Sequence, residues 1–157
     1  MKKGLFLMLL TGVLLTGCSP MSTPNFQKMV LPKFPNYYLV CPPNYCNVMP
    51  SMVAPVYPVS AEDLFNAFNQ IVSQVQYVNF IYSMPEQGQF QLVAKSLVLH
   101  FPDDIAVQFI ALSDTTSTLA IYSKSRYGFY DFGVNKRRID QWLSELSKMT
   151  AQKPQAS

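Results

Sequence analysis

The stretch that decides the fold is residues 123–142, which read SKSRYGFYDFGVNKRRIDQW. It joins the pattern of a β-strand to the pattern of an amphipathic helix, and Gly128 and Gly133 allow the backbone to turn between them. It also holds the densest group of polar and charged side chains in a chain of which only 13% of residues are charged. We therefore expect a last strand to pass into a last helix here, through a loop held by ionic side chains.

Two segments carry apolar residues at helical spacing. The first helix should begin after Ser60, whose hydroxyl is suited to cap it, and the last should be capped by Asp131 or Asn135. The expected apolar stripes are Leu64, Phe68, Ile71, Val72 and Val75 in the first helix, and Ile139, Trp142, Leu143, Leu146 and Met149 in the last.

Between the helices the apolar period changes to two residues, which is typical of strands. The pattern predicts strands over residues 77–82, 90–101, 105–112 and 119–125, with turns over 84–88, 102–104 and 113–116. Short turns between successive strands favour antiparallel pairing. The expected fold class is α+β, an antiparallel sheet of about four strands with two amphipathic helices packed on one face.

The N-terminus has the order of a bacterial lipoprotein signal. Two lysines precede an apolar run over residues 4–15, which is too short to span a bilayer comfortably. Residues 15–18 (LTGC) then resemble the lipobox, in which the cysteine, here Cys18, is acylated and becomes the first residue. An ordinary secretory signal is the alternative. Ser19 after the cysteine favours, by that resemblance, an outer-membrane lipoprotein facing the periplasm.

The prediction divides the chain into a signal peptide (1–17), an acylated proline-rich tether (18–35), a single α+β domain (36–150) and a frayed tail (151–157). Removing Lys2 and Lys3 with the signal leaves ten Lys and Arg against nine Asp and Glu. A net charge near +1 offers no basic footprint for nucleic acid. The expected partners are the membrane, through the lipid, and an envelope protein or a small anionic ligand.

Cys41 and Cys46 should form a disulfide in an oxidising envelope. Free thiols and a metal or redox site are the alternatives, although Cys-x4-Cys without a second pair is poor zinc spacing. Residues 42–58 carry five prolines among apolar residues, which predicts an extended surface segment and no central strand.

One group of polar residues, here called the ionic cluster, is the candidate functional site: Asp103, Asp104, Ser123, Ser125, Arg126, Asp131, Asn135, Arg137 and Arg138. We expect Arg126 to pair with Asp131. Arg137 and Arg138 fall in the first helical turn, where the helix dipole disfavours cations, so a carboxylate or a bound anion should compensate them. The cluster is thus an ion-pair network that locks the loop, a site for a small anion or lipid headgroup, or a protein-contact surface.

No catalytic set is recognisable in the sequence. His100 is the single histidine, and its neighbours Asp103 and Asp104 are expected at a turn. Ser123 and Ser125 lie in no Gly-x-Ser-x-Gly elbow, and there is no glycine-rich phosphate loop. The prediction is therefore a protein without catalytic residues, metal ligands or a cofactor.

Three motifs in order resemble the family called domain of unknown function 1499: residues 101–104 (FPDD), 123–128 (SKSRYG) and 131–139 (DFGVNKRRI). Residues 41–46 (CPPNYC) are similar to that family's Pro-Asn-Cys motif with Tyr45 inserted, and Tyr122 stands where members often carry Arg. The resemblance supports the fold and implies no activity. The expected function is that of an envelope lipoprotein with a non-catalytic binding or structural domain; the alternative is a module that binds a small anion or lipid headgroup at the strand-to-helix loop.

Overall fold

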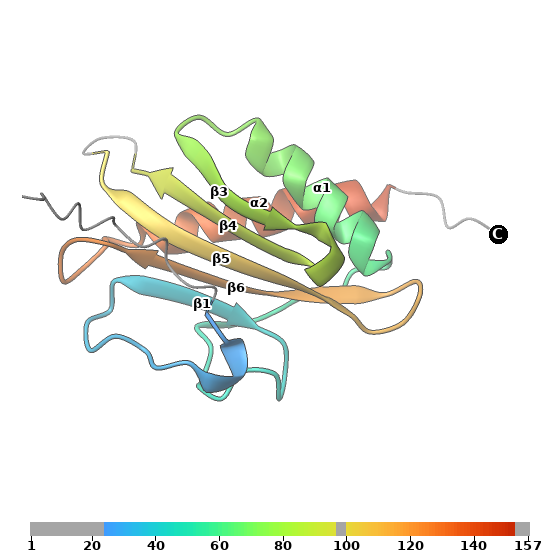
Figure 1. The fold of residues 1–157 in the computed structure, drawn as a ribbon, viewed down its shortest axis with the longest axis horizontal. Coiled ribbons are helices and arrows are strands. Elements are labelled where there is room, and N and C mark those ends of the chain that lie inside the picture. Colours follow the sequence, from blue (N-terminus) through green and yellow to red (C-terminus); the bar gives the residue numbers. More distant parts are fainter. Residues whose placement is uncertain (1–23, 97–99, 153–157) are drawn as a thin grey trace, which may run out of the picture.

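The computed structural model describes residues 24–96 and 100–152. They form a six-stranded sheet in the order β2-β1-β6-β5-β4-β3, with two α-helices on one of its faces (Figure 1). The elements are η1 (Phe26–Lys28), β1 (Tyr37–Cys41), β2 (Met52–Val53), α1 (Ala61–Ser73), β3 (Val78–Met84), η2 (Pro85–Gln87), β4 (Gln89–Lys95), β5 (Pro102–Ala111), β6 (Ser117–Ser125) and α2 (Val134–Ala151). The predicted signal peptide, Cys18 and residues 153–157 of the tail lie outside the described residues.

The expected α+β class is confirmed, and strands β3 to β6 pair antiparallel in chain order. The expected number of about four strands is wrong, because β1 pairs antiparallel with β6 and β2 pairs parallel with β1. The sequence concealed β1 because Leu39, Val40 and Cys41 are buried in succession, so no period of two marks the strand. β2 is a two-residue edge strand in the proline-rich segment.

The predicted turn at residues 102–104 is also wrong. β4 ends at Lys95, and Pro102 is the first residue of β5, a position where the missing N–H of proline is tolerated. Asp103 therefore lies in the sheet, opposite Ala94 of β4 and Ser125 of β6. The other two turns are confirmed between β3 and β4 and between β5 and β6.

Both helices pack on one face of the sheet, as predicted. Ser60 caps α1, since its Oγ accepts a hydrogen bond of 3.1 Å from the Asp63 N–H. The predicted stripes of both helices supply the core on this face, with Val75 and Met149 partly buried at its margin. The main core residues are Leu64, Phe65, Phe68, Ile71, Val72, Phe90, Leu92, Ile105, Val107, Phe109, Leu119, Ile121, Ile139, Trp142, Leu143 and Leu146.

A second, smaller core covers the opposite face of the sheet. Phe26 and Met29, which we expected in the tether, are buried there against Leu39, Ala106 and Ala120. Cys41 lies in the same cluster and forms a disulfide with Cys46, which confirms that prediction. Residues 19–157 thus contain both cores and the whole sheet. Among the described residues, no helix is long and apolar enough to cross a membrane.

Candidate functional site

Strand alternation divides the ionic cluster between the two faces of the sheet. On β5, Ile105 and Val107 belong to the helix-side core while Ala106 belongs to the opposite one. Because side chains alternate along a strand, Asp103 faces the helices and Asp104 faces away from them. On β6 the same rule places Ser123 and Ser125 on the helix side.

Four side chains on the helix side form a closed ring of hydrogen bonds. Arg138 Nη2 donates to Asp103 Oδ2 at 2.8 Å, and the other carboxylate oxygen accepts from Ser125 Oγ at 2.6 Å. Asn135 closes the ring: its Nδ2 donates to Ser125 Oγ at 3.1 Å, and its Oδ1 accepts from Arg138 Nη1 at 3.1 Å. We call Asp103, Ser125, Asn135 and Arg138 the polar ring.

The polar ring is joined to neighbouring segments, and its members are buried except Arg138, which is partly buried. Asn135 is fully buried, and its Oδ1 also accepts from Ser123 Oγ at 2.5 Å. Asn36 Nδ2, from the segment before β1, donates to the carbonyls of Ser125 and Gly128 at 3.4 and 2.9 Å. The ring therefore ties β5, β6, α2 and the start of the domain together. In a low-dielectric interior such bonds are strong when satisfied and costly when broken.

The remaining charged members of the ionic cluster lie elsewhere. Arg126 does not pair with Asp131, as we expected; it binds Asp104 with contacts of 2.6 to 3.0 Å, and its side chain is 40% exposed. Asp131 instead supports the start of α2 from two residues before the N-cap residue Gly133: its carboxylate accepts from the N–H groups of Gly133 and Asn135, each at 3.0 Å. Arg137 is exposed and donates to the carbonyl of Phe132 at 2.9 Å. The structure thus brings Asp103, Ser123, Ser125, Asn135 and Arg138 together, and does not bring Arg126 to them.

A cavity of about 880 Å³ lies beside the polar ring, between the sheet, the end of α1 and the start of α2. Asp103, Ser125 and Arg138 line it, so one wall is polar. Most of the lining surface is apolar, and half of the lining residues are apolar or aromatic: Val75, Val78, Ala94, Phe101, Tyr127, Phe129, Tyr130, Phe132, Val134 and Trp142. Lys95, Asp131 and Arg137 add charge at its margin. The carboxylate of Asp103 is already neutralised by Arg138, so the cavity favours a mainly apolar guest.

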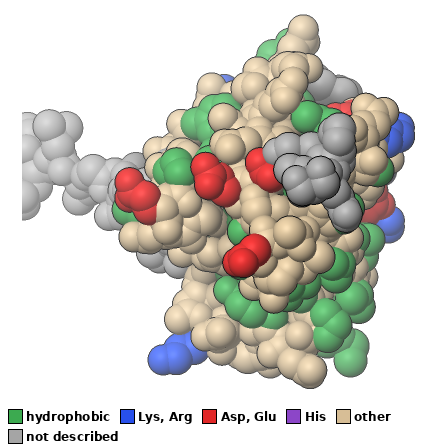
Figure 2. Space-filling model, turned by 90° about the vertical axis from the view of Figure 1, so that its right-hand side faces the viewer, with side chains coloured by type: hydrophobic (Ala, Val, Ile, Leu, Met, Phe, Trp, Pro, Cys, Tyr) green, Lys and Arg blue, Asp and Glu red, His purple; other side chains and the backbone are tan. Residues whose placement is uncertain are grey.

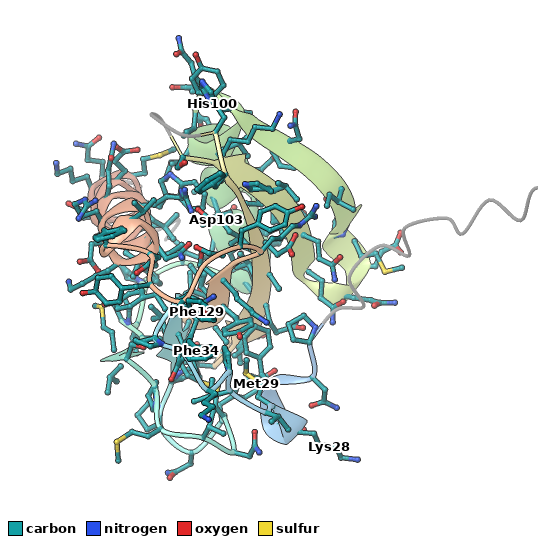
Figure 3. The ribbon with its side chains drawn as sticks, turned by 90° about the vertical axis from the view of Figure 1, so that its left-hand side faces the viewer. Lys28, Met29, Phe34, His100, Asp103 and Phe129 are labelled. Atoms are coloured by element: carbon teal, nitrogen blue, oxygen red, sulfur yellow. A yellow bond between two sulfur atoms is a disulfide. The ribbon has the colours of Figure 1, made fainter. Side chains whose placement is uncertain are left out.

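Six aromatic side chains stand exposed at the same end of the molecule, and we call them the aromatic rim: Phe34, Phe101, Tyr127, Phe129, Tyr130 and Phe132. They form three pairs of rings in contact. The ring centroids lie 4.6 Å apart for Phe34 and Phe129, 6.4 Å apart for Phe101 and Tyr127, and 5.2 Å apart for Tyr130 and Phe132. Figure 3 looks onto this end and shows Phe34 beside Phe129, with Asp103 between α2 and the sheet.

The sequence did not lead us to the cavity or the aromatic rim. Its signal was four aromatic residues within positions 127–132, in a stretch placed between a strand and a helix. A loop so rich in aromatic side chains cannot bury them all in the core it connects, which points to an exposed aromatic surface.

His100 lies outside the polar ring. Its backbone is in the left-handed region at φ 52°, and the centroid of its ring lies 5.2 Å from that of Tyr77. The carboxylate of Asp104, its neighbour in the sequence, is bound by Arg126. Within the described ranges, no group of three or more His, Cys, Asp or Glu side chains could hold a metal ion.

Two solved structures are similar to part of this chain. The di-domain ARO/CYC StfQ from the steffimycin biosynthetic pathway has a TM-score of 0.47 and 7% identity, over 62% of this chain and 44% of its own. The di-domain ARO/CYC BexL from the BE-7585A biosynthetic pathway has a TM-score of 0.45 and 9% identity, over 61% of this chain and 44% of its own. The present chain thus spans less than half the length of either.

No curated protein matches the sequence. A family model does match, over residues 21–146, a range that includes every described strand and most of α2. The chain therefore belongs to the family described as Protein of unknown function (DUF1499).

Proposed function

We propose that this protein is a membrane-anchored, non-catalytic binding protein of the bacterial envelope, and that its cavity takes a small molecule with a large apolar part. The observation that carries the proposal is the cavity itself. Its volume of about 880 Å³ lies within the range of about 300–1,000 Å³ usual for ligand pockets. Its lining combines a mainly apolar surface with a few fixed polar groups, which is also the usual composition of such pockets.

The polar ring supports a binding role because it holds the polar wall rigid. Asp103 Oδ1 and Oδ2, Ser125 Oγ and Asn135 each already have partners within the ring, so a guest need not satisfy them. A guanidinium carries five N–H groups, and Arg138 uses one from each of Nη1 and Nη2 in the ring. One polar group of the guest can therefore meet Arg138 while its apolar part fills the cavity.

The second candidate is binding of a small anion or lipid headgroup. Arg138, Arg137 and Lys95 line the same cavity and favour it. The site differs from the one expected from the sequence, because Arg126 faces the other side of the sheet with Asp104. The two candidates differ in what binds. If the site takes a small anion, inorganic phosphate alone should bind; if it takes a mainly apolar molecule, binding should require the apolar part of that molecule.

The anchor of this proposal is an acylated Cys18 in the outer membrane, with the domain in the periplasm. Its support is the order of charged residues, apolar run and lipobox in residues 1–18. Mass spectrometry of the protein purified from membranes tests it: the mature chain should begin at a lipidated Cys18. An unmodified N-terminus at another residue would contradict the anchor without bearing on the cavity.

The cavity is tested by energy transfer from Trp142. This is the single tryptophan of the chain, and it lines the cavity. Residues 19–157 are titrated with 11-(dansylamino)undecanoic acid, whose dansyl group accepts energy from tryptophan. We expect saturable transfer with one probe per protein, and no competition by inorganic phosphate.

The matched variants are Val78→Phe and Val56→Phe. Val78 lines the cavity, and the larger ring should weaken probe binding at least tenfold by filling the space. Val56 is 64% exposed and is not among the lining residues, so the same substitution there should leave binding unchanged. Equal binding by both variants would contradict a ligand site in the cavity.

A further inference from the structure

We propose that the aromatic rim is a membrane-contact surface for an anionic bilayer, so that the cavity opens toward the membrane and takes the acyl chain of a bilayer lipid. This deepens the proposed function and rests on it. The rim and the cavity are one continuous region, because Phe101, Tyr127, Phe129, Tyr130 and Phe132 belong to both.

The first support is the exposure of the rim. Phe132 is 78% exposed, Phe129 70% and Tyr127 63%. Soluble surfaces seldom gather so many large apolar groups in one place unless something covers them. Aromatic rings, particularly those of tyrosine with a polar tip, are the side chains favoured at the membrane–water interface.

The second support is the backbone that presents these rings. Gly128, Phe132 and Gly133 have φ values of 84°, 53° and 72°, all in the left-handed region. Glycine adopts that region freely, but a bulky phenylalanine does not. In this unfavourable conformation the ring of Phe132 is 78% exposed and contacts the ring of Tyr130, so it gains little burial from the protein. Conformations of this kind persist mainly where a function retains them.

The third support is the distribution of charge. Lys33 is exposed beside Phe34, Arg137 bonds to Phe132, and Lys95 lines the cavity. At this end of the described chain, Arg126 and Arg138 are paired with Asp104 and Asp103, which leaves these three cations against Asp131. The opposite end of the molecule carries Glu62 and Asp63 in the first turn of α1, Glu86 in η2 and Asp114 in the β5–β6 turn. Figure 2 faces that opposite end and shows the acidic side chains spread over it. Such a charge asymmetry turns the aromatic rim toward anionic lipids.

The fourth support is the length of chain available to the anchor. Only five residues lie between Cys18 and Pro24, the first described residue, and the six Cα-to-Cα steps of that fully extended chain span at most about 20 Å. Packing of Phe26 and Met29 on the sheet fixes the start of the domain from there on. Pro24 lies beside Gln89 and Gln108, away from the rim, so the short tether keeps the domain near the bilayer while the aromatic rings and the charges decide which end rests on it.

The test is binding of residues 19–157, without any lipid anchor, to vesicles of phosphatidylcholine with and without an equal amount of phosphatidylglycerol. The rim variant combines Tyr130→Ser with Phe132→Asn, which removes a contacting pair of rings together. The matched control combines Val30→Asn with Met49→Ser, which removes two apolar side chains exposed to 91% and 89% outside the rim. Co-flotation with vesicles measures binding, and transfer from Trp142 to soluble dansyl acid measures the cavity separately.

We expect the wild type to bind the anionic vesicles more tightly than the neutral ones. The rim variant should bind them about tenfold more weakly, as loss of two interfacial aromatic rings implies. Because Tyr130 and Phe132 also line the cavity, its uptake of the dansyl acid should weaken as well. The control should bind as the wild type does. Vesicle binding by the rim variant equal to that of the wild type, or no vesicle binding by the wild type, would overturn the proposal.

Ligand binding in the cavity and membrane contact by the aromatic rim can be tested independently. Val78→Phe should keep vesicle binding while it loses the dansyl acid, because it fills the cavity and leaves the rim in place. If the wild type binds vesicles through the rim but takes up no dansyl acid, the cavity is not an acyl site, and both the proposed function and the acyl-chain part of this inference are contradicted.

Discussion

The carboxylate of Asp103 and the guanidinium of Arg138 meet at 2.8 Å inside the protein, although 35 positions separate them in the chain. The Asp103 side chain is 3% exposed and that of Arg138 12%. Asp104, the next residue, meets Arg126 on the other face of the sheet, where the arginine is 40% exposed. Two neighbouring aspartates thus each pair with an arginine, and the two pairs differ chiefly in burial.

That difference predicts unequal costs of removing each arginine. Arg138→Met leaves a buried carboxylate without its cation and should lower the free energy of unfolding by about 3–5 kcal/mol. Arg126→Met removes a pair that is partly exposed and should cost at most about 1 kcal/mol. Urea denaturation of both variants measures the difference. Similar losses for the two would show that the buried pair does not hold β5 to α2.

The support that Asp131 gives to the start of α2 leads to a second prediction. Asp131→Ala removes the acceptor for two backbone N–H groups at the start of α2 and should cost about 1 kcal/mol. Asp114→Ala, in the exposed β5–β6 turn, is the control and should change little. Thermal unfolding monitored by circular dichroism compares them, and an unchanged Asp131→Ala variant would argue against that support.

Phe132 should be replaceable with a gain in stability. Phe132→Asn exchanges a 78% exposed ring in the left-handed region for a residue that tolerates that region better. We expect the free energy of unfolding to rise by up to about 1 kcal/mol, while binding to anionic vesicles falls. A loss of stability would instead indicate that the ring is held by the protein and serves the fold.

The disulfide should make a modest contribution to the stability of the fold. The Cys41–Cys46 bond closes a short loop with a sequence separation of 5, so reduction should lower the free energy of unfolding by about 2 kcal/mol. Unfolding in urea with and without dithiothreitol measures this, with the Cys41→Ala, Cys46→Ala double variant as the control that should not respond to the reductant.

Stability should fall at alkaline pH because of buried tyrosines. Burial, with a smaller contribution from Tyr37, raises the pKa of Tyr122 to about 12, and burial also raises the pKa of Tyr57 above its ordinary value. An unfolded tyrosine loses its proton near pH 10, so the stabilisation is complete below about pH 10 and is lost as the pH rises toward about 12.

Each buried tyrosine with a raised pKa makes the free energy of unfolding fall more steeply with pH, by up to about 1.4 kcal/mol per pH unit. Tyr122→Phe should therefore flatten the pH dependence of the free energy of unfolding above pH ~10. Tyr130→Phe, on the exposed rim, controls for loss of a hydroxyl group. If the free energy of unfolding depends on pH in the same way for the Tyr122→Phe variant and the wild type, Tyr122 does not cause the loss of stability at alkaline pH.

The helices could be predicted because each depends on a local pattern. The stripe from Ile139 to Leu146 recurs at helical spacing, and all its members are buried in the helix-side core. Ser60 could likewise be identified as a cap from its place before that pattern begins. The disulfide followed from the number of cysteines and the expected compartment.

The arrangement of the ionic cluster could not be predicted, because it depends on strand boundaries and alternation. Reading residues 102–104 as a turn left the two aspartates equivalent. In the strand that forms there, neighbouring residues face opposite sides, and this sends Asp103 to Arg138 and Asp104 to Arg126. The cavity could not be predicted for a similar reason. It lies between elements whose packing against one another is not described by any local sequence pattern.

The most direct test of a ligand site in the cavity is native mass spectrometry of the protein purified from its own membranes without harsh detergent. The account predicts a wild-type mass that exceeds the covalent mass of the chain by one lipid or other acyl-bearing molecule, and a Val78→Phe protein without that increment. A wild-type protein that is consistently free of any guest, or a Val78→Phe protein that retains the same one, would contradict it.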